Sequence, residues 1–251
     1  MQLARREVIG RYRGSVMGLA WSFLNPLLML AVYTIFFTVL HGSRIGSVGP
    51  TNQADFAITL FAGLIIHGFF AECINRAPSV IVSNANYVKK VVFPLEILPI
   101  VTAMAALFHV GVSLTMLVSV QLLLNQTFAW TMIFFPMLIL PFALLTLGLS
   151  WFLAAIGVYV RDVSQLTVFL TTVLLFLSPV FYAVESLPAR VQPFIRANPL
   201  TFVIEQSRAV LLHNAIPDWQ GLAVYTLMSA VVAGLGLWSF QKMRKGFADV
   251  L

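Results

Sequence analysis

Basic side chains near the amino terminus are the groups in this chain best suited to bind an anion. Arg11 and Arg13 flank Tyr12, shortly before a long apolar run that starts at Trp21. An arginine fork can hold a phosphate with two hydrogen bonds, and each basic residue near a charged membrane surface attracts anionic head groups by about 1 kcal/mol. We expect Arg11, Tyr12 and Arg13 to gather a phosphate-bearing lipid at a membrane entrance. The competing interpretation is a plain topology signal.

Signatures of enzyme chemistry are missing from the sequence. There is no Gly-x-x-x-x-Gly-Lys-Ser/Thr loop, so ATP hydrolysis needs a partner chain. There is no Gly-x-Ser-x-Gly elbow, and the four histidines stand too far apart for a local metal motif. We expect no catalytic residue, no metal and no cofactor in this chain.

Three ionisable residues fall within or beside apolar runs. His67 and His109 are interpreted as packing residues, with a proton relay as the alternative. Glu72 is expected to pair with Arg76, one helical turn later. Cys73 is the single cysteine, which excludes an intrachain disulfide.

The composition is that of an integral membrane protein. Of 251 residues, 60% are apolar and 10% charged, against about 45–50% and 25% in an average soluble domain. In a membrane protein the net charge of +6 is informative through its distribution between loops. We therefore interpret it as a topology signal and expect membrane lipid, not nucleic acid, as a partner.

Uncharged runs predict an all-α fold with six transmembrane helices in one domain over 1–251. The stretch 97–160 has no Asp, Glu, Lys or Arg in 64 residues, enough for two spans of about 20–25 residues each. The spans are expected at about 21–41, 56–75, 97–124, 130–160, 163–184 and 219–241.

The remaining segments are expected to lie at the membrane surfaces. Residues 1–20 form an amino-terminal interfacial segment, and 75–96 a short helix with Pro78 in its first turn. The proline-rich segment 185–218 holds short amphipathic or re-entrant helices, one of them capped by Asn198 with Pro199 at its first position.

Positive charges orient the spans. The amino-terminal segment, the 75–96 loop, the turn at Arg161 and the carboxy-terminal tail together hold eleven of the fifteen Lys and Arg. Cytoplasmic loops are enriched in these residues, so both termini are expected in the cytoplasm.

Two motifs resemble those of a known family. Arg11-Tyr12-Arg13-x-Ser15-x-x-Gly18-x-x-Trp21-x-x-x-x-Pro26 at the first span resembles the membrane subunit of ABC transporters that export O-antigen, capsule or teichoic acid. The run from Tyr87 to Pro99 resembles the same family's loop after its second span. Met17 stands where the family usually has leucine.

The resemblance implies the permease subunit of an exporter that moves a lipid-linked, O-antigen-like polysaccharide across the bacterial inner membrane. It implies a homodimer with two copies of a separate ATPase, which binds ATP and Mg. Alternatives are export of teichoic acid, another lipid or a drug. A stand-alone carrier or lipid-modifying enzyme predicts paired intramembrane ionisable groups or an internal repeat, and the sequence shows neither clearly.

The resemblance also implies an aromatic-lined glycan channel and a docking loop for the ATPase. Aromatic rings can stack on sugars, although such rings also face lipid or neighbouring helices in ordinary spans. The candidates for the path are Tyr33, Phe36, Phe37, Trp151, Phe176, Phe181 and Tyr182. The docking candidates are Asn84, Tyr87, Lys89, Lys90 and Glu96, with anchoring of Lys89 and Lys90 to anionic lipid as the other interpretation.

Overall fold

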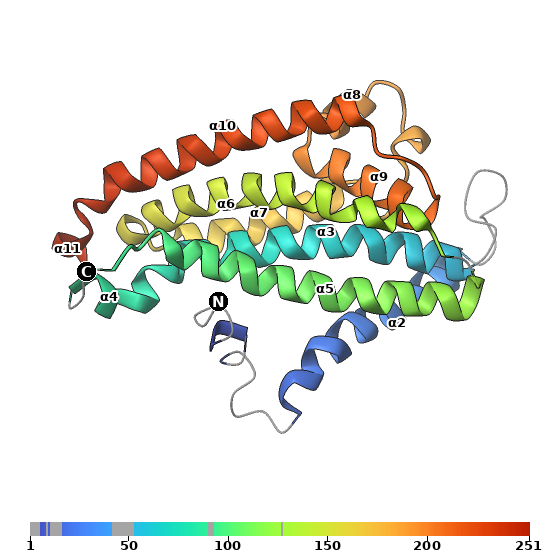
Figure 1. Cartoon of the computed structure of the whole chain (residues 1–251), viewed down its shortest axis with the longest axis horizontal. Helices are drawn as coiled ribbons and strands as arrows, with labels where there is room; N and C mark the ends of the chain where they lie inside the picture. The colour runs from blue at the N-terminus through green and yellow to red at the C-terminus, as the bar shows by residue number, and fades with distance from the viewer. Residues whose placement is uncertain (1–5, 9, 11–16, 42–52, 90–92, 127) are drawn as a thin grey trace.

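The computed structural model describes residues 6–8, 10, 17–41, 53–89, 93–126 and 128–251. All regular structure in these ranges is helical, which confirms the all-α class. Four long helices, α3 (Gln53–Val80), α5 (Ile97–Asn125), α6 (Phe135–Tyr159) and α10 (Trp219–Arg244), run along the length of the bundle (Figure 1). Helix α2 (Trp21–His41) crosses beside α3 and α5.

Helix α3 is the centre of the bundle. It packs against α2, α5, α6, α7 and α9, and its apolar side chains include Ile66, Phe69 and Phe70, all buried. Five helices of the bundle therefore contact α3 directly, whereas α10 packs on α6.

Four helices in the described ranges are long and apolar enough to cross a membrane: 55–80, 97–123, 130–159 and 219–244. The 26 residues of the first extend about 39 Å at 1.5 Å per residue, more than the hydrocarbon core of about 30 Å. Helix α2 has 21 residues, but many of its side chains lie outside the described part.

The fifth predicted span is shorter than expected. Helix α7 (Val163–Leu177) has 15 residues, about 22 Å, and the prediction of a continuous helix to 184 is wrong. Ser178 is extended, with φ −103° and ψ 151°, because the ring of Pro179 disfavours the helical conformation in the residue before it. The apolar residues that follow form turns and the single 3-10 turn Val184–Ser186.

The predicted helix start at Pro78 is also wrong. Helix α3 continues through Pro78 to Val80, followed by the 3-10 turn Val82–Asn84 and the short helix α4 (Ala85–Lys89). Pro78 removes one helical hydrogen bond close to the helix end, where little helix remains to be disrupted. The backbone of α6 packs against it, since a Cβ added at Gly157 would overlap the Pro78 carbonyl.

Local signals located the next helix correctly. After the short α8 (Gln192–Arg196), α9 (Pro199–Leu212) begins with Asn198 as its cap. The Asn198 side chain accepts a hydrogen bond from the Leu200 N–H at 3.0 Å. One face of α9 is buried, formed by Leu200, Thr201, Val203, Ile204, Ser207, Val210 and Leu211.

Helices α6 and α10 pack closely against each other. A Cβ added at Gly236 would overlap the carbonyl group of Gly148, and one added at Gly148 would lie 2.6 Å from the Ala233 Cα. Small residues at such crossings let two backbones approach closely, which is how helices associate without help from water.

Candidate functional site

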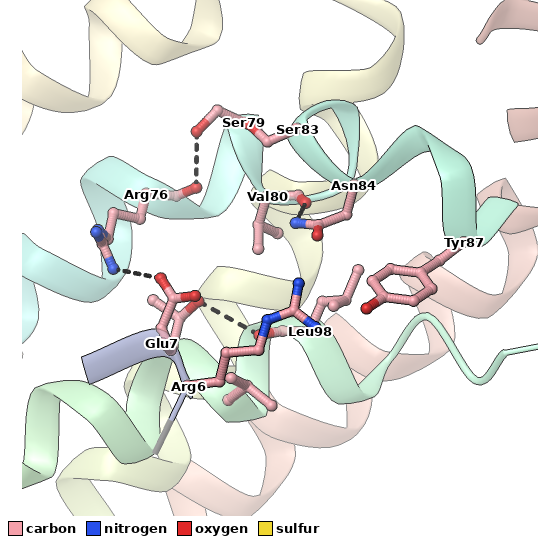
Figure 2. Close-up of a pocket in the computed structure, with 11 residues that line it drawn as sticks. Arg6, Glu7, Arg76, Ser79, Val80, Ser83, Asn84, Tyr87 and Leu98 are labelled. Carbon is pink, nitrogen blue, oxygen red and sulfur yellow. Dashed lines mark hydrogen bonds and ion pairs between the residues drawn. The ribbon is translucent and has the colours of Figure 1, made fainter. Parts of the chain in front are cut away.

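A polar cavity of about 220 Å³ lies at the end of the bundle where α3 stops (Figure 2). Its walls come from the amino-terminal turn, the end of α3, the turn into α4, and the first turns of α5. The lining residues are Arg6, Glu7, Arg76, Ser79, Val80, Ser83, Asn84, Tyr87, Leu98, Val101 and Thr102.

Two arginines and one carboxylate set the charge of the cavity. The Arg76 Nη1 donates to Glu7 Oε1 at 2.9 Å, and Figure 2 shows the Arg6 guanidinium directed into the same space. The side chains of the Arg76–Glu7 pair are 36% and 41% exposed. A pair this accessible contributes about 0–1 kcal/mol to stability, so another anion can replace Glu7 at little cost.

Polar contacts within the turn after α3 shape the rest of the wall. Asn84 donates its Nδ2 to the Val80 carbonyl at 2.9 Å, and the Ser79 hydroxyl donates to the Arg76 carbonyl at 3.2 Å. The Tyr87 ring stacks on Phe93 with centroids 4.7 Å apart, and its hydroxyl points toward the cavity in Figure 2.

Glu96 connects this end of α5 to two other helices. Its carboxylate accepts from Arg244 Nη1, at the end of α10, at 3.0 Å. Its carbonyl accepts from the Trp151 indole of α6 at 2.9 Å. Nearby, the Tyr159 hydroxyl donates to the Met243 carbonyl at 2.8 Å, and Phe247 is fully buried. The start of α5, the end of α6 and the end of α10 are therefore tied together beside α4.

Three of the five predicted docking residues, Asn84, Tyr87 and Glu96, occur together at this end of the molecule. Lys89 ends α4, but its side chain is outside the described part, and Lys90 is outside the described residues. Sequence reasoning missed Arg244 and Arg6. Nothing in the local sequence signals a contact between residues 148 positions apart, such as Arg244 and Glu96.

The predicted aromatic path residues occupy three different places. Phe176, 63% exposed, stacks on Phe181 with centroids 5.7 Å apart, and the Tyr182 hydroxyl donates to the Phe176 carbonyl at 3.1 Å. Trp151 is 7% exposed and packs in the protein interior. The side chains of Tyr33, Phe36 and Phe37 on α2 are outside the described part, as are residues Arg11, Tyr12 and Arg13.

The ionisable residues of the spans pair differently from the prediction. Arg76 contacts Glu7, whereas the Glu72 carboxylate lies 3.1 Å from His109 Nδ1 on α5. His67 Nε2 lies 2.9 Å from the Thr171 carbonyl. Glu72 and His109 thus form an ionisable pair between α3 and α5, 37 residues apart, which the sequence did not show.

Comparison with known proteins identifies the family of this chain. Residues 1–212 match the family described as ABC-2 type transporter. The chain is 29% identical to the O-antigen export system permease protein RfbA of Myxococcus xanthus, over 99% of this chain and 94% of the relative.

Capsule exporters are also similar to it. Identity is 26% to the capsule polysaccharide export inner-membrane protein CtrC of Neisseria meningitidis serogroup B, over 97% of this chain and 90% of the relative. The chain is 23% identical to the polysialic acid transport protein KpsM of Escherichia coli, over 92% of this chain and 88% of the relative. Since the family match covers most of the sequence, the chain belongs to the ABC-2 type transporter family.

Proposed function

We propose that this chain is the permease subunit of an ABC exporter that moves a lipid-linked polysaccharide across the bacterial inner membrane. One observation carries the proposal: relatives similar over nearly the whole chain are named as permeases or membrane proteins of polysaccharide export. The sequence has no phosphate-binding loop, so ATP and Mg bind to a separate ATPase subunit.

The working assembly is a homodimer with two copies of the ATPase. A two-fold axis is the commonest symmetry of homo-oligomers, and two copies provide a central path that one small bundle cannot. Phe169 and Phe176 on α7 are 64% and 63% exposed, which is apolar surface that lipid or the second copy covers. Phe176, Phe181 and Tyr182 remain the candidates for the substrate path among the predicted aromatics with described side chains, because Trp151 is buried in the interior.

Both termini and residues 75–96 face the cytoplasm, whereas 42–55 and 185–218 face outward. Eleven of fifteen Lys and Arg support this orientation. The test uses single cysteines at two exposed positions, Ser83 and Ser186, in a Cys73→Ser background. A membrane-impermeant maleimide should label position 186 in intact cells and position 83 only after permeabilisation, and labelling of position 83 from outside would overturn the orientation.

The ATPase docks at the end of the molecule formed by Asn84, Tyr87 and Glu96. This end joins the central α3 to α5 and, through Arg244, to α10. A push on α4 therefore reaches three long helices as a rigid-body displacement.

Purified complex tests both the function and the docking site. The permease alone should hydrolyse no ATP, and the complex should hydrolyse it faster when lipid-linked glycan is added. Arg244→Glu places two carboxylates together, and we expect it to remove most of this stimulation. The exchange E96R/R244E restores an ion pair and should restore stimulation.

Lys245→Glu is the matched control, because it makes the same charge change at an exposed neighbouring residue and should leave stimulation unchanged. If R244E and K245E behave alike, the Glu96–Arg244 pair does not transmit the signal. If no lipid-linked glycan ever stimulates the complex, the proposed function is wrong.

A further inference from the structure

We propose that the cavity at the end of α3 binds a phosphate or diphosphate group, and that Glu7 is a built-in competitor for that anion at Arg76. The inference rests on the proposed function, because a lipid-linked polysaccharide presents its phosphate at the cytoplasmic membrane surface. It assigns the recognition of that group to Arg6 and Arg76.

The charges of the cavity fit such a ligand. Arg6 and Arg76 come from separate segments and line the same space. Glu7 neutralises one of the two positive charges through its 2.9 Å contact with Arg76. When Glu7 moves away, two guanidinium groups face a phosphate of about −1.5 to −2 charges, and each can donate two parallel hydrogen bonds to it.

The size and the donors of the cavity fit as well. A volume of about 220 Å³ equals about seven water molecules at about 30 Å³ each. That space has room for one or two phosphate groups. Hydroxyl groups of Ser83 and Tyr87 belong to the same wall, and hydroxyls donate to phosphate oxygens.

The exchange of Glu7 for phosphate connects binding to the transport machinery. Glu7 lies in the segment that leads to the first membrane span, and Asn84 and Tyr87 line the cavity from the proposed docking loop. A phosphate on Arg76 releases the amino-terminal turn from α3. Binding of the substrate phosphate in the cavity thus affects both the amino-terminal turn and the proposed docking loop.

The test measures binding of radiolabelled polyprenyl diphosphate to the full-length chain in phosphatidylcholine nanodiscs. Loss of the charge-assisted hydrogen bonds in R6Q/R76Q should weaken binding by about tenfold or more. Glu7→Gln removes the competitor while keeping its shape, and should tighten binding about threefold. Arg161→Gln, at an exposed turn, is the control for a lost positive charge and should bind normally.

The Glu7 variant separates ligand binding from a structural role. If the Arg76–Glu7 pair only holds the amino-terminal turn in place, E7Q weakens binding as R6Q/R76Q does, and the proposal is overturned. It is also overturned if R6Q/R76Q binds like R161Q, or if polyprenol without phosphate binds equally well.

Two competitors identify the source of the phosphate. Inorganic diphosphate that competes only at far higher concentration than polyprenyl diphosphate indicates a lipid head group. Equal competition indicates a soluble anion and leaves the cavity chemistry intact.

Export is measured separately from binding. If the complex moves glycan while the arginine variants bind the lipid normally, the cavity assignment fails and the proposed function stands. If the variants show the expected binding pattern but the complex moves no glycan, the proposed function fails and the cavity assignment stands.

Discussion

Gly236→Ala should destabilise the protein more than any other single methyl addition to α10. The new Cβ would overlap the Gly148 carbonyl of α6, and because the obstacle is backbone, no side chain can turn aside. Overpacking costs about 1–3 kcal/mol when side chains can adjust, so we expect about 3 kcal/mol or more here. The melting temperature of the purified chain in detergent, followed by tryptophan fluorescence, should fall by about 6–12 °C.

Gly234→Ala is the matched control on the same helix. A Cβ at this position meets no atom within 4 Å, and alanine is a better helix former than glycine by about 1 kcal/mol. Its melting temperature should stay the same or rise. Equal melting temperatures for the two variants would show that α6 and α10 are not in backbone contact.

Arg208→Met should be comparably severe at the other end of the bundle. The guanidinium donates to the carbonyls of Thr59, Pro179 and Val180 at 3.0, 2.6 and 2.7 Å. It therefore ties α9 to α3 and to the turn that follows α7. Three charged hydrogen bonds of about 1.5 kcal/mol each give an expected loss of about 4 kcal/mol.

The charge of Arg208 should not vary over the usual pH range. Burial lowers the pKa of its guanidinium to about 10, while the nearby Glu205 carboxylate acts in the opposite direction. A cation whose folded pKa lies below its unfolded value makes stability depend on pH only where the two states differ in protonation, which begins above about pH 9, and there the stability rises with pH. The effect of R208M should thus be the same at pH 6 and pH 8.

Arg196→Met is the control for R208M. Arg196 is 58% exposed and lies 3.7 Å from Glu185, so its removal should cost about 0–1 kcal/mol. Arg208→Lys keeps the charge but cannot reach three carbonyls at once, and should melt between the wild type and R208M. If R208M and R196M have the same melting temperature, the three carbonyl contacts of Arg208 do not stabilise the protein.

The fold was predictable from sequence where the deciding signal is local. Asn198 and Pro199 specify a helix start through one hydrogen bond and one fixed φ angle, and α9 begins there. The end of α7 was missed because an apolar run does not distinguish a helix from an extended segment. The local signal for the helix end was Pro179, because a proline disfavours the helical conformation in the residue before it, whatever the hydropathy of the run.

Other features depend on tertiary packing and have no signal in the neighbouring residues. Pro78 starts helices in many sequences, yet α3 continues through it and packs against α6 at Gly157. Glu72 was assigned to Arg76 because helical neighbours are the only pairs that a sequence displays. In the structure Glu72 meets His109 and Arg76 meets Glu7, partners 37 and 69 residues away.

If this chain, with its ATPase, carries a lipid-linked polysaccharide across the membrane, the transfer can be followed directly in a reconstituted system. The most direct measurement uses proteoliposomes that contain the complex with its ATPase sites facing out and a labelled lipid-linked glycan in the outer leaflet. On addition of ATP and Mg, the label should become resistant to an external glycosidase, and it should stay accessible when either subunit is omitted. Hydrolysis of ATP with the glycan still fully accessible would rule out ATP-driven transport by this complex, as would movement of the glycan by the permease alone at the same rate.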